Sequence, residues 1–79
     1  MLAAGRAKGG ENVRFCDKLV RLRAEKGFSQ EGLANLLGVS RQAVSKWESG
    51  AAMPELTKLT VIADLFDTSL DYLVRDNVE

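Results

Sequence analysis

The chain has 79 residues, of which 46% are hydrophobic and 28% charged, and its formal net charge is zero. This length and composition are typical of one small globular domain. A single cysteine and no histidine exclude a disulfide framework, nearly every zinc-site pattern and catalysis by a histidine base. No apolar run approaches the roughly 20 residues needed to cross a membrane. We therefore expect a cytoplasmic protein, acting at the nucleoid, with no cofactor, no metal and no membrane contact.

Apolar residues three and four positions apart, with a single proline in the chain, predict an all-α fold of five helices. We place the folded domain at residues 13–75, with a frayed end at 76–79. Residues 1–12 contain two cations and no periodic apolar pattern, so we expect a disordered arm. This arm is either a solvated tail or a basic extension that reaches a DNA minor groove.

Charge is distributed unevenly along the chain. Residues 13–50 carry seven Lys or Arg against four acids, a net charge of +3. Residues 51–79 carry two cations against six acids, a net charge of −4. A basic half and an acidic half predict that one face of the protein meets an anion. The excess of +3 is modest for a DNA-binding surface. It therefore supports an anion-binding face but is not sufficient evidence for one.

The first helix is predicted over residues 13–26. Its apolar stripe repeats at helical spacing between Phe15 and Leu22, and Gly27 follows at the usual end position. Cys16 lies beside the stripe and is interpreted as a small core residue, since a redox role lacks a partner thiol. Three cations are expected on the solvated face of this helix: Arg14, Lys18 and Arg21.

Residues 28–50 contain two short amphipathic segments joined at a glycine. Ser29 and Ser40 each precede one segment, where a serine oxygen can cap free N–H groups. Each serine is flanked by an apolar N′ and N4 pair, which forms a hydrophobic staple: Phe28 with Leu33, and Val39 with Val44. Helices over 30–37 and 41–48, joined by about three residues containing Gly38, predict a helix-turn-helix.

The second helix of this pair is predicted to have two different faces. Val44 and Trp47, three residues apart, are expected in the core. The opposite surface then carries four polar residues: Arg41, Gln42, Ser45 and Lys46. Arginine can read guanine, glutamine can read adenine, and serine can contact either bases or phosphate. Because the second helix of a helix-turn-helix enters the major groove, we predict that these side chains read base edges.

The fourth helix is predicted from Pro54, at its first position, to about Phe66, and the fifth from Leu70 to Val74 after a Ser69 cap. Five residues of the fourth helix are expected to face inward: Leu56, Leu59, Ile62, Ala63 and Phe66. Asp67 stands where the fourth helix must end, in a conformation that Asp tolerates. A dimer needs an apolar patch outside the core, for which the candidates are Val61, Leu65, Tyr72 and Val74.

The run LRAEKGFSQEGLANLLGVSRQAVSKWESG, followed by P-x-L-x-x-L-x-x-I-A-x-L-F and S-L-D-Y-L, closely resembles the xenobiotic-response-element family. These are the Cro/repressor-type helix-turn-helix domains of bacteria and their phages. The resemblance covers Phe15 to Val74. It implies a compact five-helix, lambda-repressor-like domain that binds an inverted-repeat operator as a dimer. Transcriptional repression is the commonest role in this family.

The resemblance also assigns individual residues. It implies that Gln30 contacts a DNA phosphate, and we expect the same of three serines at helix ends: Ser29, Ser40 and Ser49. It pairs Arg23 with Glu48 as a structural ion pair between the first helix and the end of the third. One departure matters: the loop at 51–53 is Ala-Ala-Met, where relatives often carry a cation that touches phosphate. Gly32 also replaces a residue that is usually a good helix former.

Two classes of function are open besides DNA binding. The chain could be an interaction module that meets a protein partner, because Val61 and Leu65 lie off the apolar stripe and the C-terminal half is acidic. An enzyme is the weakest interpretation, since the sequence contains no recognisable glycine-rich phosphate loop or pair of catalytic carboxylates. The leading hypothesis is a dimeric regulator, most often a repressor, that binds double-stranded DNA.

Overall fold

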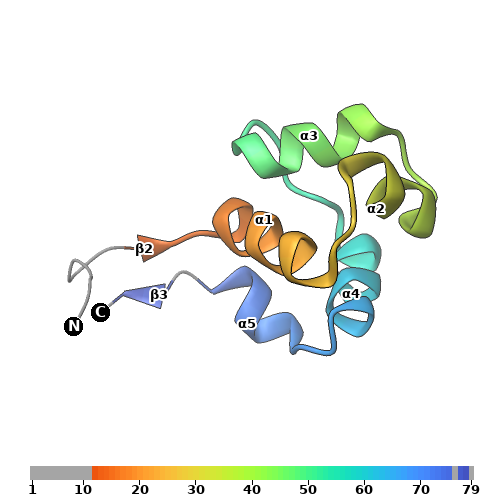
Figure 1. Ribbon diagram of the computed structural model, residues 1–79. Helices are drawn as coiled ribbons and strands as arrows, with labels where there is room; N and C mark the ends of the chain where they lie inside the picture. The colour runs from red at the N-terminus through yellow and green to blue at the C-terminus, as the bar shows by residue number, and fades with distance from the viewer. Residues whose placement is uncertain (1–11, 76, 79) are drawn as a thin grey trace.

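The computed structural model describes residues 12–75 and 77–78 of the chain. Within these residues the structure has five helices: α1 Phe15–Lys26, α2 Gln30–Leu37, α3 Arg41–Ser49, α4 Leu56–Leu65 and α5 Leu70–Val74. Helix α1 lies between α3 on one side and α5 on the other (Figure 1). Helix α4 contacts α2 and α5. The all-α fold of five helices is therefore confirmed.

The starts of α2, α3 and α5 follow the predicted serine caps. Ser29 Oγ accepts the Gly32 N–H at 2.9 Å, and Ser40 Oγ accepts the Ala43 N–H at 3.1 Å. The bounds predicted for α2 and α5 agree with the structure, and α3 is one residue longer than expected. Asp67 ends the α4 turn with a φ of 54°, the left-handed conformation anticipated at this position.

Two short strands were not expected from the sequence. Strand β2 (Asn12–Val13) pairs antiparallel with β3 (Asn77–Val78), so that the beginning and end of the described chain meet. Helix α1 consequently begins at Phe15 and not at Val13, whose backbone belongs to the strand. Most of the arm predicted to be disordered, residues 1–11, lies outside the described residues, as do residues 76 and 79 of the predicted frayed end.

The start of α4 differs from the prediction. The helix begins at Leu56 with Glu55 as its N-cap, so Pro54 precedes the helix and is not its first residue. Pro54 is buried, whereas Leu56 is 64% exposed, and the expectation that Leu56 faces inward is wrong. Leu56 instead lies at the surface in the first turn of α4, directly after the N-cap Glu55.

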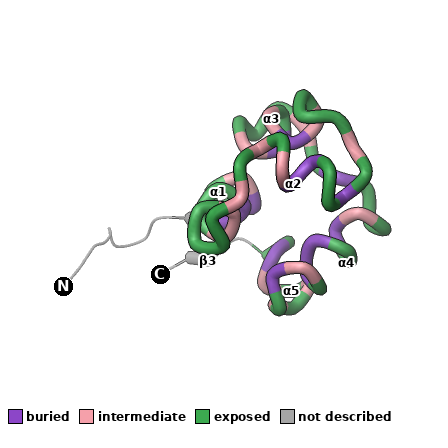
Figure 2. The backbone as a smooth tube through the Cα atoms, turned by 45° about the vertical axis from the view of Figure 1, so that its right-hand side comes forward, coloured by how far each residue is buried: buried purple, intermediate pink, exposed green. Residues whose placement is uncertain are grey.

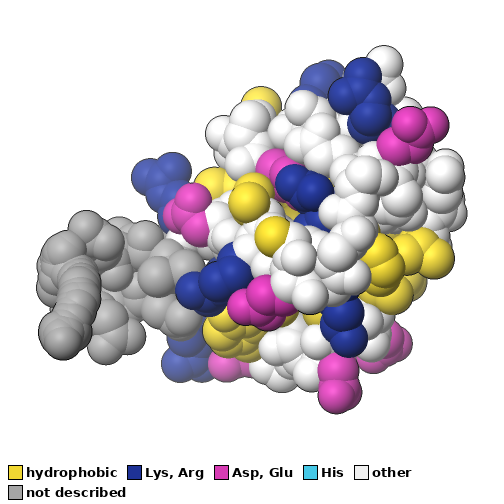
Figure 3. All heavy atoms as spheres, in the orientation of Figure 1, with side chains coloured by type: hydrophobic (Ala, Val, Ile, Leu, Met, Phe, Trp, Pro, Cys, Tyr) yellow, Lys and Arg dark blue, Asp and Glu magenta, His cyan; other side chains and the backbone are white. Residues whose placement is uncertain are grey.

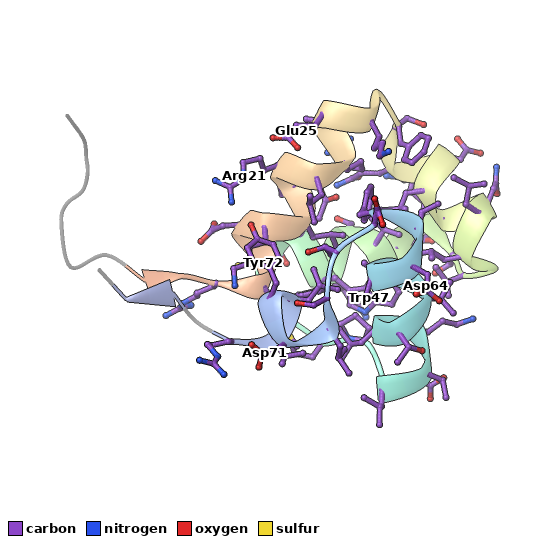
Figure 4. The ribbon with its side chains drawn as sticks, turned by 90° about the horizontal axis from the view of Figure 1, so that it is seen from below. Arg21, Glu25, Trp47, Asp64, Asp71 and Tyr72 are labelled. Atoms are coloured by element: carbon purple, nitrogen blue, oxygen red, sulfur yellow. The ribbon has the colours of Figure 1, made fainter. Side chains whose placement is uncertain are left out.

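All five helices contribute to one core. Its buried residues are Phe15, Leu19, Leu33, Ala34, Leu37, Val44, Trp47, Leu59, Ile62, Ala63, Phe66 and Leu73. In Figure 2 these buried positions recur along each helix on the side turned to the interior. Trp47 is part of this core (Figure 4), as the spacing from Val44 predicted. Burial of these apolar side chains is the main force that holds the short helices together.

Lys18 is fully buried, so its predicted place on a solvated face is wrong. Its ammonium group donates to the carbonyl oxygens of Tyr72 and Arg75 at the end of α5. Lys58 of α4 acts in the same way at the end of α2, where its Nζ lies 2.9 Å from the carbonyl oxygen of Leu37. Neither α2 nor α5 has a basic residue in its own last turn. A lysine from another helix therefore bonds carbonyl oxygen at the end of each helix: Leu37 for α2, Tyr72 and Arg75 for α5.

Candidate nucleic-acid interface

A three-residue turn places α3 at a sharp angle to α2. Gly38 adopts a φ of 72°, which a residue with a side chain rarely tolerates. The Val39 N–H donates to the carbonyl oxygen of Ala34 at 3.0 Å, which closes the end of α2 before Ser40 caps α3. Both helices then bury their apolar sides, and the outer side of α3 lies at the surface (Figure 1). This geometry is that of a helix-turn-helix.

The outer side of α3 consists of polar groups that are free to bind a ligand. Arg41, Gln42 and Lys46 are exposed and Ser45 is half-buried, while Val44 and Trp47 face the core. Within residues 14–75, none of the four polar side chains forms a hydrogen bond with the protein. Figure 3 shows Lys and Arg side chains gathered at the top of the molecule, where Figure 1 places α3. These donors and acceptors match the chemistry of base edges.

The start of α2 presents backbone donors beside this face. The N–H groups of Gln30 and Glu31 lie in the first turn and find no acceptor within residues 14–75. Ser29 and Ser40 are exposed, and each uses its oxygen as an acceptor, which leaves the hydroxyl hydrogen free to donate. A helix N-terminus with free N–H groups attracts an anion such as phosphate.

The hydroxyl of Ser49 is less available for a phosphate contact than the hydroxyls of Ser29 and Ser40. Its hydroxyl donates to the carbonyl oxygen of Lys46 at 3.0 Å and accepts the N–H of Ala51 at 3.3 Å. Both bonds close the end of α3. Its predicted phosphate contact would require the hydroxyl hydrogen to leave the Lys46 carbonyl.

The ion pair between Arg23 and Glu48 is present. Arg23 Nε lies 2.6 Å from Glu48 Oε2 and Nη2 lies 3.1 Å from Oε1, a bidentate arrangement. The side chains are 19% and 6% exposed. Arg23 Nη1 also donates to the carbonyl oxygen of Phe28 at 2.9 Å. The pair therefore joins α1, the start of α2 and the last turn of α3, and holds the angle at which α3 faces solvent.

Gln30 takes part in the same network. Its Nε2 lies 3.0 Å from Glu48 Oε1, so the side chain expected at a phosphate also bonds to the protein. The sequence contains no local sign of this contact, because the two residues are 18 positions apart and on different helices. The buried role of Lys18 was missed for the same reason, since its partners lie 54 and 57 positions away.

The four residues proposed for a dimer interface have different surroundings. Val61 on α4 and Val74 on α5 are exposed, whereas Leu65 and Tyr72 are partly buried against the core. The Tyr72 hydroxyl accepts a hydrogen bond from Arg21 Nη2 at 2.8 Å (Figure 4). Val74 lies at a small cavity of about 220 Å³, between the start of α1 and the loop after α3. Tyr72 thus already has a role inside the domain.

Two other kinds of site were sought in the described part of the chain. It contains no group of His, Cys, Asp or Glu side chains that could hold a metal ion. None of its helices has the length and apolar character to cross a membrane.

The comparison with known proteins agrees with this geometry. The sequence model of the helix-turn-helix family matches residues 19–73 of the chain. The SPbeta prophage-derived uncharacterized HTH-type transcriptional regulator YonR of Bacillus subtilis is 38% identical over 61 residues, 77% of this chain and 56% of that protein. The HTH-type transcriptional activator BcrR of Enterococcus faecalis is 44% identical over 62 residues, 78% of this chain and 30% of that protein.

Among solved structures, the P22 c2 repressor in complex with a synthetic operator superimposes with a TM-score of 0.75 and 26% identity. This match covers 78% of the present chain and 94% of the repressor chain. The chain spans about half, or less, of the length of the two curated relatives.

Proposed function

The chain belongs to the helix-turn-helix family of XRE type, and we propose that it is a sequence-specific regulator of transcription that binds double-stranded DNA through the outer side of α3. The observation that carries this proposal is the set of unbonded polar side chains on that helix: Arg41, Gln42, Ser45 and Lys46. A polar outer side is common on surface helices, but here it belongs to the second helix of a helix-turn-helix, the element that enters the major groove.

In this mechanism α3 lies in the major groove and contacts base edges. Arg41 is suited to the two acceptors of guanine, and Gln42 to the donor and acceptor of adenine. The free N–H groups at the start of α2 bind a backbone phosphate, together with the hydroxyls of Ser29 and Ser40. The ion pair of Arg23 with Glu48 keeps α2 and α3 at the angle that permits both contacts.

The operator is proposed to be an inverted repeat bound by two copies of the chain. The P22 c2 repressor, which shares the fold, is described in complex with a synthetic operator. Repression is the proposed outcome, because a regulator bound across a promoter excludes the polymerase. The relative BcrR is named an activator, so the position of the operator would decide the direction of regulation. The site of action is the nucleoid in the cytoplasm.

A selection from a random duplex library at near-physiological salt tests this function. Enrichment of an inverted repeat, with half-sites about one helical turn or roughly 10 bp apart, is the expected result. Enrichment of a single half-site would support sequence-specific DNA binding and contradict the proposed dimer. If no sequence is enriched and only salt-sensitive background binding remains, the proposal is wrong.

A second function is supported by exposed apolar side chains away from α3. Leu36 on α2 is 55% exposed and Leu56 on α4 is 64% exposed. Figure 3 shows a hydrophobic surface on the side where α2 and α4 lie in Figure 1. Surfaces of this kind occur at contacts between proteins. Purification with a stoichiometric protein partner, and no retardation of any duplex, would favour an interaction module as the main function.

A further inference from the structure

A cavity of about 220 Å³ lies where the start of α1, the end of α3 and the end of α5 meet. None of the residues that we assign to DNA lines it. It is lined by the aromatic residues Phe15 and Trp47, and by Met53 and Val74. In Figure 3 hydrophobic side chains reach the surface between the places that α1 and α3 have in Figure 1. The cavity is therefore a separate feature of the surface, with a mostly apolar lining.

Two of the apolar side chains around the cavity are open to solvent. Met53, in the loop after α3, is 57% exposed, and Val74, the last residue of α5, is 46% exposed. Cys16 adds a half-buried thiol, whose Sγ lies 3.8 Å from the place that a Cβ on Gly50 would take. Water fills a cavity stably only where it finds about two to four polar partners. This lining offers few of them, so an apolar ring can replace the water.

The charge at the cavity is positive. Arg14, the N-cap residue of α1, is the only charged residue that lines it in the described part of the chain. Its side chain is exposed, and its guanidinium forms no ion pair with another described residue. A guanidinium presents paired N–H donors that match the two oxygens of a carboxylate. A ligand with an apolar ring and a carboxylate would therefore satisfy both parts of the site.

The volume limits the size of such a ligand. Pockets for drug-sized molecules have volumes of about 300–1,000 Å³, whereas a cavity of about 150 Å³ is enough for benzene. The present volume lies between these limits and corresponds to one aromatic ring with a short substituent. We propose that the cavity is a binding site for a small aromatic carboxylic acid, with its ring against Trp47 and Met53 and its carboxylate at Arg14. This inference goes beyond DNA binding and can be tested on the free protein.

The chain carries two unique reporters in the lining of this cavity. Trp47 is its only tryptophan and Cys16 its only cysteine. Phenylacetate, phenylacetamide and phenethylamine share one ring and differ in charge, so the fluorescence of Trp47 is measured during titration with each of them. Phenylacetate should bind with a Kd of about 1 mM, as a ligand of about ten non-hydrogen atoms allows. The neutral amide should bind about fivefold more weakly, and the cationic amine more weakly still.

Two substitutions test the charge and the cavity separately. Arg14→Met should lower the affinity for phenylacetate about fivefold and leave the affinity for phenylacetamide unchanged. Its matched control, Lys26→Met, removes a cation at the other end of α1 and should alter neither affinity. Ala52→Leu should abolish binding of both ligands, because the larger side chain occupies part of the cavity. Its matched control is Ala51→Leu, at the exposed neighbouring position that does not line the cavity.

Alkylation of Cys16 gives a second measurement that needs no variant, should Ala52→Leu not fold. Iodoacetamide reacts with the half-buried thiol of the free protein, and mass spectrometry follows the rate. Phenylacetate at about ten times its Kd should slow this reaction about tenfold, since only the unoccupied protein reacts. Phenethylamine at the same concentration should slow it less.

Three outcomes would overturn the proposal. Equal affinity for all three ligands would mean that the cavity does not select by charge, which contradicts the proposed class of ligand. No change in Trp47 fluorescence or in Cys16 alkylation at about 10 mM phenylacetate would mean that the cavity binds no such acid. Equal loss of binding in Ala51→Leu and Ala52→Leu would place the ligand elsewhere. Because none of these measurements includes DNA, each outcome is independent of the operator selection.

Discussion

The ammonium group of Lys18 lies 4.5 Å from the centre of the Tyr72 ring and donates to the carbonyl oxygen of the same residue. One side chain of α1 thus contacts both the ring and the backbone of α5. A buried ammonium group is costly unless its hydrogen bonds are satisfied. Here the acceptors are carbonyl oxygens at a helix C-terminus, where the helix dipole also favours a cation.

Substitution Lys18→Met should lower the free energy of unfolding by about 1–3 kcal/mol, since it leaves two carbonyl oxygens of α5 without their donor. Urea denaturation followed by circular dichroism measures the change. Lys26→Met, at the exposed end of α1, is the control and should alter stability by less than about 0.5 kcal/mol. Unchanged or increased stability of Lys18→Met would mean that burying the charge costs as much as its bonds contribute.

Removal of the arginine from the ion pair with Glu48 should be strongly destabilising. Arg23→Met leaves a nearly buried carboxylate with Gln30 as its remaining partner in the described residues, at a cost of about 3 kcal/mol. Arg75→Met breaks an exposed pair with Asp71 and should cost at most about 1 kcal/mol. Thermal or urea unfolding compares the two variants. Equal effects would show that burial does not distinguish these pairs.

The outer side of α3 should be required for operator binding and dispensable for folding. The double change Gln42→Ala and Lys46→Ala should abolish binding to a selected operator, because it removes one amide and one cation that we propose to contact the DNA. The helical circular dichroism spectrum should be unchanged, since both residues are exposed. The control changes Asp71 of α5 and Arg75, which directly follows α5, to alanine. Operator affinity that survives in the α3 variant would refute the site assignment.

The loop after α3 offers a gain-of-affinity test. It carries the exposed Ala51 at a position where the family resemblance leads us to expect a cation. Ala51→Lys should tighten DNA binding and make the slope of log K against log salt steeper by about 0.9, the contribution of one phosphate contact. Thr60→Lys adds the same charge on the exposed side of α4 and should leave the slope nearly unaltered. Identical slopes for the two variants would place Ala51 away from DNA.

The turn between α2 and α3 requires glycine at one position. Gly38 has a φ of 72°, so Gly38→Ala should cost about 1–2 kcal/mol of stability. Gly32 is different, because it lies inside α2 and its φ is ordinary for a helix. A Cβ at position 32 would lie 3.1 Å from Ser29 Oγ, the cap of the same helix. Gly32→Ala should therefore gain less than the about 1 kcal/mol that helix propensity alone allows. Denaturation curves of both variants measure the contrast.

The glycine at position 32 illustrates what a local pattern cannot explain. Propensity marks it as unfavourable in a helix interior, and the sequence offers no compensation. In the structure Gly32 lies beside the capping oxygen of Ser29, which accepts its N–H. Glycine lowers the helix propensity at this position, but it leaves room for the capping side chain.

The sequence by itself determined the number of helices, the serine caps of α2, α3 and α5, and the side of α3 that faces solvent. These features depend on residues one to four positions apart: Ser29 and Ser40 cap the N–H three residues later, and Val44 with Trp47 defines the buried side of α3. The pairing of Arg23 with Glu48 was also foreseen, through a resemblance to related chains and not through spacing.

Only the tertiary structure decided the roles of Lys18, Leu56 and Gln30. The partners of Lys18 lie more than fifty positions away, and the contact of Gln30 with Glu48 crosses from one helix to another. Leu56 has an apolar side chain that fits the inward pattern, yet it lies at the surface in the first turn of α4. Periodicity reports which side of a helix is apolar, but the packing of the helices against one another decides which polar group is buried and what it bonds.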